Sequence, residues 1–210
     1  MNAVDLGVNL FVTLFALLDP IGNLPIFAAA TAVAIDNAQM HAETLRQQQR
    51  LGELQVIEGF DDDGRPRLRP PASDVTTHQL LTHTAGFGYD FFNENYRRLT
   101  ADHGVPAVAT ATRASLRTPL LFDPGTEWEY GSGVDWAGQV IEAVTGRRLR
   151  EVMDERVLDP LCMSDTGFAL SDDARRRRAV LHMRKRGELV PNHRWEQPAD
   201  PEIDMGGQGL

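Results

Sequence analysis

Apolar residues follow two different patterns along the chain, and the pattern changes near residue 50. Residues 6–35 are apolar almost throughout, with polar interruptions at Asn9, Thr13, Asp19, Asn23 and Thr31. From residue 51 onward, apolar and polar residues alternate over the short periods that are typical of a globular fold. We therefore expect an apolar segment over residues 1–35, a polar linker or helix over residues 36–50 and an α+β domain over residues 51–210.

The clearest helix of the globular part is predicted over residues 133–144. Apolar residues recur there on one face at the 3.6-residue period, and Gly146 is a typical terminator. A second helix is predicted over residues 149–158, because Pro160 follows it. A short helix is predicted over residues 77–81, with a threonine cap ahead of it.

Weaker patterns complete the prediction of local structure. Residues 91–101 and 105–115 are further helix candidates. Residues 61–64, Asp-Asp-Asp-Gly, predict a turn, and the proline-rich residues 65–73 predict an extended loop. The arginine run at residues 175–178 indicates a solvated helix face or loop.

Composition narrows the function classes. The formal net charge of −9 argues against a nucleic-acid partner, which requires a basic face. Cys162 is the single cysteine, so no internal disulfide can form, and its apolar neighbours predict a buried structural thiol. His78 and His83 are five residues apart and do not share a helix face, so we expect neither a metal nor a cofactor.

The apolar residues 6–35 are numerous enough to cross a bilayer. No Lys or Arg precedes them, which disfavours a cleaved signal peptide, and Pro20 favours a broken helix. If they span, Arg46 and Arg50 follow the span, and the positive-inside rule places the downstream part in the cytoplasm. We expect a protein of a bacterial inner membrane with membrane contact through residues 6–35; a soluble cytoplasmic or periplasmic protein is the alternative.

A specific motif lies within this segment. Residues 19–25 read Asp-Pro-Ile-Gly-Asn-Leu-Pro and directly follow the run Phe-Val-Thr-Leu-Phe-Ala-Leu-Leu at residues 11–18, within a stretch that ends at Phe27. This stretch resembles the first membrane segment of the MarC family of integral membrane proteins, and the resemblance covers residues 1–48. That family has several spans, and no apolar segment after Arg50 supplies another.

Four further motifs follow in order over residues 80–210. They are Leu-Leu-Thr-His-Thr-Ala-Gly at residues 80–86, Phe-x-Pro-Gly ending in Tyr-Gly-Ser at 122–132, Ile-Glu-x-Val-Thr-Gly at 141–146 with Pro-Leu-Cys-Met-x-x-Thr-Gly-Phe at 160–168, and Met-Gly-Gly-Gln-Gly-Leu at 205–210. Their order resembles β-lactamase-related serine hydrolases, which include class C β-lactamases, DD-peptidases and carboxylesterases. The resemblance implies a partial β-lactamase/transpeptidase-like fold over residues 51–210, mostly its helical part and loops.

The resemblance also implies a site. Tyr130 matches the family's proton-shuttling tyrosine, and Ser132 occupies the third position of the Tyr-x-Asn motif. His83, Gly206 and Gly207 are the implied substrate-binding positions. A nucleophile elbow at Ser132 is disfavoured, because the elbow requires glycine two residues before and after the serine.

The nucleophile of the family is absent from these 210 residues. The family activates its serine with a lysine one helical turn later, as Ser-x-x-Lys. Lys185 is the single lysine here, and His182 stands three residues before it. The late Lys-Thr-Gly or His-x-Gly motif does not occur before Leu210 either. We expect the strand that helps to form the oxyanion hole to be missing together with this motif.

We therefore expect an incomplete hydrolase domain that does not turn over a small-molecule ester or β-lactam. Three alternatives remain open: a MarC-like membrane protein with a passenger domain, a non-catalytic chain completed by a partner that supplies Ser-x-x-Lys, and a chimera without function. Asp123 is expected to stabilise the turn in which it lies. The three tryptophans are expected to be packing residues: Trp128, Trp136 and Trp195.

Overall fold

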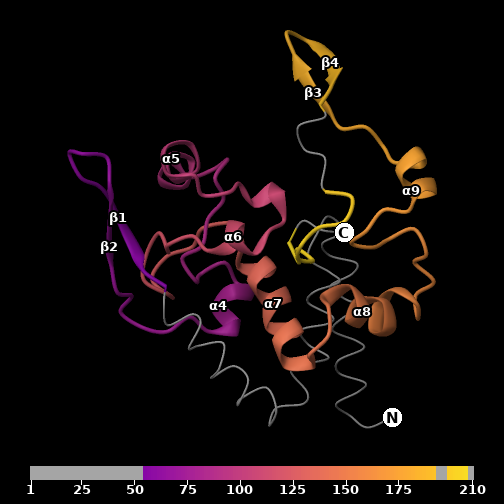
Figure 1. Cartoon of the computed structure of the whole chain (residues 1–210), viewed down its shortest axis with the longest axis horizontal. Helices are drawn as coiled ribbons and strands as arrows, with labels where there is room; N and C mark the ends of the chain where they lie inside the picture. Colours follow the sequence, from indigo (N-terminus) through magenta and orange to yellow (C-terminus); the bar gives the residue numbers. More distant parts are fainter. Residues whose placement is uncertain (1–53, 193–197, 208–210) are drawn as a thin grey trace.

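Helix α7, Gly133–Thr145, is the longest helix in the part of the chain that the computed structural model describes, residues 54–192 and 198–207. It contacts α4 (Thr77–Leu81) on one side and α8 (Leu149–Met153) on the other (Figure 1). Gly146 ends the helix in the left-handed region, with φ of 67°. The predicted helix over residues 133–144 is therefore confirmed to within one residue.

The core is built around α7, which buries residues in two clusters. On one side, three α7 residues pack against α8 and Phe168: Val134, Ala137 and Ile141. On another side, Val140 joins Leu80 of α4, Phe87 and Leu120. Because both clusters share this helix, its position fixes the loops that precede and follow it.

The two weaker helix predictions were only partly right. The first candidate is α5, Glu94–His103, which begins behind the Asn93 cap and ends at Gly104. The second was wrong as a continuous helix. A 3₁₀ turn at Val108–Thr110 is separated from α6, Arg113–Leu116, because Ala111 takes a left-handed φ of 48° and Thr112 caps a new helix.

The predicted helices on either side of α7 are confirmed. Thr76 caps α4, and its side chain accepts a hydrogen bond from the Gln79 backbone. Helix α8 continues into a π-helical turn, Asp154–Leu158, and the helical segment ends before Pro160. Together α8 and this turn cover the predicted residues 149–158.

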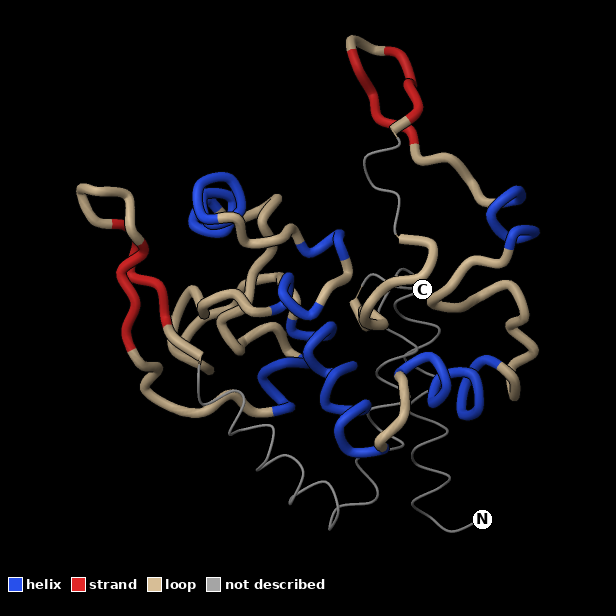
Figure 2. Tube along the Cα trace, viewed as in Figure 1, coloured by secondary structure: helices blue, strands red, loops and turns tan. Residues whose placement is uncertain are grey.

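Four short strands form two separate antiparallel hairpins. Strands β1 (Val56–Phe60) and β2 (Pro66–Arg69) enclose the predicted turn at residues 61–64. Strands β3 (His182–Lys185) and β4 (Glu188–Pro191) form the second hairpin, which stands away from α7 at the top of Figure 1. Figure 2 shows that loops make up most of the remaining described chain. Helices with small sheets confirm the α+β class.

Three sequence predictions concern whether particular side chains are buried or exposed to solvent. The arginine run lies in and just after α9, Asp172–Arg177, and is exposed as expected. Cys162 was predicted to be buried but is exposed, because it turns the chain after the π-helical segment with φ of 56°. Trp128 was predicted to pack but is 64% exposed, whereas Trp136 stacks on Phe87. Trp195 lies outside the described residues.

No helix among the described residues is both long and apolar enough to cross a membrane. The predicted membrane segment at residues 6–35 and the linker at residues 36–50 lie outside those residues.

A buried carboxylate attaches the late segment of the chain to the start of α8. Asp204 has no exposed surface and accepts hydrogen bonds from the guanidinium groups of Arg148 (2.8 Å) and Arg150 (2.6 Å) and from the Arg150 backbone N–H (3.0 Å). Ile203 and Met205, on either side of Asp204, are buried against Leu116. The ion pairs thus place residues 203–207 against the helical core.

Replacing Asp204 by alanine is expected to lower the free energy of unfolding by about 2 kcal/mol. The expected loss lies below the 3–5 kcal/mol of a fully buried ion pair, because both arginines remain partly exposed to solvent. Urea unfolding measures the change. Asp200→Ala is the matched control: it removes a pair to Arg150 through a carboxylate that is 83% exposed, and a change below about 0.5 kcal/mol is expected. Equal losses in the two variants would contradict this role of Asp204.

Candidate functional site

Two loops that carry the first two motifs lie against each other. One follows α4 and the other precedes α7. Backbone hydrogen bonds join Gly125 N–H to Thr84 C=O (2.7 Å), Glu129 N–H to His83 C=O (3.0 Å) and Leu121 N–H to Gly86 C=O (2.7 Å). Segments some 40 residues apart in sequence therefore form one platform, and the motif residues are held by backbone rather than by flexible side chains.

Two glycines allow the loops to approach this closely. At Gly131 a Cβ atom would lie 2.3 Å from the Phe87 carbonyl oxygen, and at Gly133 it would lie 2.4 Å from the Leu80 carbonyl oxygen. Both distances are well inside van der Waals contact, so only glycine fits without moving the backbone. These contacts fix the backbone on each side of Ser132.

The platform brings Tyr130 and His83 together, as the sequence motifs implied. Their ring centroids are 4.8 Å apart, and the Tyr130 side chain is 39% exposed. The Gly131 N–H donates to Nδ1 of His83 at 3.5 Å. Burial lowers the pKa of His83, which favours the neutral imidazole whose nitrogen can accept this bond. His83 itself takes a left-handed φ of 58°.

The rings around Tyr130 fix its orientation. Tyr89 lies edge-on at a centroid distance of 5.5 Å, and Phe92 lies edge-on at 6.3 Å. Edge-to-face contacts of this kind are favourable beyond their buried area. Tyr130 therefore presents a partly exposed hydroxyl on a ring that is held on several sides.

Ser132 lies next to Tyr130 but lacks an activating partner. It is only 3% exposed and occupies the N-cap position of α7, where its carbonyl accepts from the Trp136 N–H (3.0 Å) and its side chain makes no capping bond. Among the described residues, no histidine, lysine or carboxylate hydrogen-bonds its hydroxyl. The neighbouring cavity measures about 10 Å³, too little for a substrate. A serine without a base is a weak nucleophile.

A second pair of site residues was missed by the sequence analysis. Asp135, in the first turn of α7, has no exposed surface; its Oδ2 accepts from the Tyr89 hydroxyl (3.1 Å), and its Oδ1 accepts from the Gly207 N–H (2.7 Å). Burial raises the pKa of Asp135 to about 7, and the two hydrogen bonds oppose that rise only in part. Burial also raises the pKa of Tyr89. Through Tyr89 and Asp135, the glycine-rich segment is connected to Tyr130.

The two predicted glycines of that segment differ in position. Gly207 lies at the carboxylate of Asp135, where a Cβ would meet both Asp135 oxygens and the Tyr89 hydroxyl at 3.1–3.2 Å. Gly206 is buried beside Gly138 of α7. The sequence carried little signal for the missed pair, because Asp135 shares its helix face with Gln139 and Glu142 and reads as part of the polar side of the helix.

Asp123 was expected to stabilise its turn, but only its backbone carbonyl does so, by accepting from Thr126, whereas its carboxylate binds a distant segment. Its two oxygens accept from the Arg69 guanidinium at 2.8 Å each, and the Ala72 N–H donates to Oδ1 at 2.8 Å. The hydrogen bonds from Arg69 lower the pKa of Asp123 to about 2. This carboxylate therefore ties the β1–β2 hairpin to the platform and is not a general acid or base.

Comparisons with known proteins agree with this geometry. The Beta-lactamase family model matches residues 29–210. Monacolin J acid methylbutanoyltransferase of Aspergillus terreus is 36% identical over 165 residues, which are 76% of this chain and 40% of that protein. Lovastatin esterase of Penicillium rubens is 38% identical over 138 residues, which are 64% of this chain and 35% of that protein. The chain thus spans well under half the length of these relatives.

A solved structure supports the fold. The unliganded simvastatin synthase (LovD) of Aspergillus terreus, as its selenomethionyl derivative, superposes with a TM-score of 0.71 at 31% identity, covering 90% of this chain and 49% of that one. The MarC-like start that the sequence suggested finds no support in the comparisons, and the Beta-lactamase match itself includes residues 29–50. The match extends over more than half of the chain, which therefore belongs to the Beta-lactamase family.

Proposed function

We propose that this chain supplies the tyrosine side of an acyl-transfer site for a small-molecule ester, and that its 210 residues bind such an ester without turning it over. The single observation that carries the proposal is the contact between Tyr130 and His83 on a platform that the Gly131 and Gly133 backbones hold in place. The names of the two relatives, a methylbutanoyltransferase and a lovastatin esterase, indicate the class of ligand.

Tyr130 is suited to move a proton in this chemistry. An acyl transfer takes a proton from the attacking hydroxyl and delivers one to the leaving oxygen, and a positioned phenol can do both. The Tyr130 hydroxyl belongs to a partly exposed side chain, and its ring is fixed by His83, Tyr89 and Phe92. His83 acts as a positioning residue, because its ring contacts Tyr130 and its nitrogen accepts from the next backbone amide.

We expect this chain to bind the ester without turning it over. The chain holds no Ser-x-x-Lys pair, since His182 precedes its single lysine by three residues. Ser132 is buried and has no base among the described residues. A nucleophile supplied from outside these 210 residues would restore the missing half of the chemistry. A stable complex with a chain that carries Ser-x-x-Lys is the form in which this candidate would be active.

Ester binding is testable without turnover. We expect ethyl 2-methylbutyrate to shift the backbone amide resonances of residues 83, 131 and 207 in ¹⁵N-labelled full chain, because His83 and Gly131 adjoin Tyr130 and Gly207 is connected to it through Asp135 and Tyr89. Tyr130→Ala is expected to weaken binding by roughly fivefold or more through loss of a partly buried ring. Leu161→Ala is the control, since Leu161 is 61% exposed and its segment, residues 160–168, contributes none of the site residues. Absence of shifts at the solubility limit, or equal weakening in both variants, would contradict the proposed site.

A further inference from the structure

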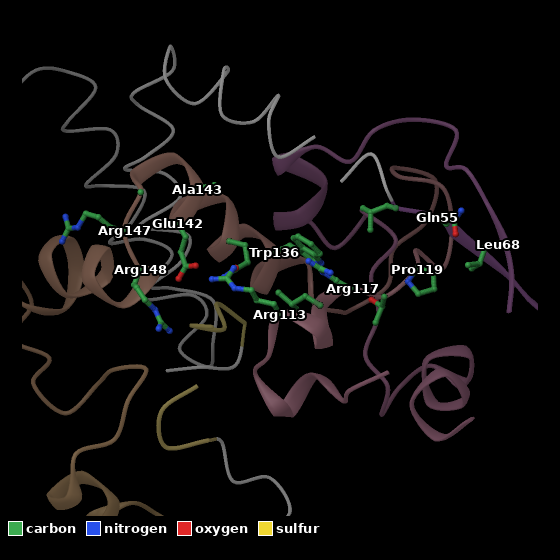
Figure 3. A pocket seen from close by; sticks show the side chains of 15 residues that line it. Gln55, Leu68, Arg113, Arg117, Pro119, Trp136, Glu142, Ala143, Arg147 and Arg148 are labelled. Atoms are coloured by element: carbon green, nitrogen blue, oxygen red, sulfur yellow. The ribbon is translucent and has the colours of Figure 1, made fainter. Parts of the chain in front are cut away.

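A second cavity lies away from Tyr130. It measures about 1080 Å³ and opens between the β1–β2 hairpin, α6 and α7 (Figure 3). Its walls contain none of the predicted site residues, and the acyl-transfer proposal does not use it. Ligand sites commonly have volumes of this order, with mostly apolar walls and a few polar groups that fix orientation. The donors, charges and apolar side chains of its walls indicate the chemistry of the ligand that it fits.

Two buried donors at this cavity have no acceptor among the described residues. The Trp136 indole nitrogen and the Gln139 side-chain nitrogen are both buried, and no hydrogen-bond partner for either lies in the described part of the chain. The orientation of the Gln139 amide follows from its neighbour: its oxygen accepts from Nη1 of Arg113 at 3.2 Å, and the reverse orientation would set two donors against each other. Only 9% of the Gln139 surface is exposed, so its side-chain N–H groups cannot reorient to donate to solvent water.

The charged groups of the walls also favour an anion. Arg117 lines the cavity and forms no ion pair with any residue of the described segments. Arg113 has one long ion pair, 3.8 Å to Glu202, and both side chains of that pair are more than half exposed. Figure 3 shows Arg113 and Arg117 on the same side of the cavity as Trp136. Free positive charge and unpartnered donors therefore lie together.

The remaining charges of the lining are already paired. Arg147 pairs with Glu155, and Arg148 pairs with the buried Asp204. Glu142, the one acidic residue of the lining, accepts the Leu149 N–H at 3.0 Å. These contacts leave the Arg117 side chain and the side-chain nitrogens of Trp136 and Gln139 as the donors of the wall that have no acceptor among the described residues.

Another part of the wall is apolar. Leu54, Leu68 and Leu116 line it, and Trp136 is held by stacking on Phe87 at a centroid distance of 5.6 Å. A fixed indole beside leucine side chains fits a flat or alicyclic body, whereas the donor wall fits a carboxylate. We propose that this cavity binds a small organic carboxylate with an apolar ring body.

The test uses 2-naphthoate as the probe and 2-naphthalenemethanol as its uncharged match. In ¹⁵N-labelled full chain, 2-naphthoate is expected to shift the Trp136 indole N–H resonance, assigned through Trp136→Phe. The alcohol is expected to bind at least about tenfold more weakly, since it lacks the charge that Arg117 meets. Arg117→Gln and Gln139→Leu are each expected to weaken 2-naphthoate binding by about tenfold, and Arg175→Gln, an exposed arginine of α9, is expected to leave it unchanged.

Several results would overturn the proposal. They are no shift of the Trp136 indole resonance by 2-naphthoate, equal binding of the alcohol, and equal weakening by Arg175→Gln. Inorganic phosphate that competes as well as 2-naphthoate would also overturn it, because the apolar wall would then contribute nothing. Circular-dichroism melts of each variant separate loss of binding from loss of fold.

Discussion

The Asp135→Asn variant will be more stable than the parent chain above pH 7, and the difference between the two will shrink as the pH falls from 7 to 4. Burial raises the pKa of Asp135 in the folded protein to about 7, from an ordinary value of 3.8. Between these values the folded state binds more protons at this site than the unfolded state. Stability therefore falls with rising pH in that window, and the full penalty is present above pH 7.

A shift of about three pH units corresponds to about 4 kcal/mol at pH 8. Asparagine is neutral at every pH, so it removes the penalty. Its oxygen can still accept from the Gly207 N–H, and its amide can donate to the Tyr89 hydroxyl. Urea unfolding of both proteins at one-unit steps from pH 4 to pH 8 measures the difference.

The comparison isolates Asp135 from other titrating groups. His83 also titrates near this window, and its lowered pKa makes the folded state lose stability at acid pH, but it does so in both proteins. Asp62→Asn, an exposed carboxylate, serves as the control and is expected to show no pH-dependent difference. A constant difference between Asp135→Asn and the parent across the range would show that Asp135 does not titrate as a buried acid.

Gly131→Ala is expected to destabilise the fold by about 3 kcal/mol or more. The new Cβ would lie 2.3 Å from the Phe87 carbonyl oxygen and 2.5–2.6 Å from backbone atoms of Gly88, so one of the two loops must move. Movement would also carry Tyr130 away from His83, since Gly131 is the next residue. The measured quantities are the free energy of unfolding and the chemical shifts of the His83 ring.

Gly167→Ala is the matched control for that substitution. Nothing lies within 4 Å of the position that its Cβ would take, so a change below about 0.5 kcal/mol is expected. If Gly131→Ala were as stable as Gly167→Ala and kept the His83 shifts, the close contact between the two loops could not be what positions Tyr130.

Local sequence signals predicted the elements that local forces determine. The apolar face and terminal glycine gave α7, and the threonine cap gave α4. The continuous helix over residues 105–115 failed, because a left-handed Ala111 and the Thr112 cap divide it. The buried Cys162 failed for a related reason: apolar neighbours in sequence do not ensure burial when a turn carries the segment to the surface.

The residues of the candidate site also fall into those that the sequence predicted and those that it could not predict. Tyr130 and His83 follow from motifs that the family shares, and the structure brings them together. Tyr89 and Asp135 could not be derived from spacing, because the bond from Gly207 to Asp135 joins residues 72 positions apart. The second cavity likewise combines the hairpin, α6 and α7, and its unpartnered donors become visible only once these elements are packed.

Intact-mass analysis of the purified chain, after treatment with a fluorophosphonate and separately with a penicillin, tests the central claim most directly. The account predicts a cooperatively melting protein that gains no mass from either reagent, because these 210 residues contain no Ser-x-x-Lys pair and the buried Ser132 has no base among the residues that the structure describes. A stoichiometric adduct on the folded chain, localised by peptide mapping to Ser132 or another serine, would contradict it.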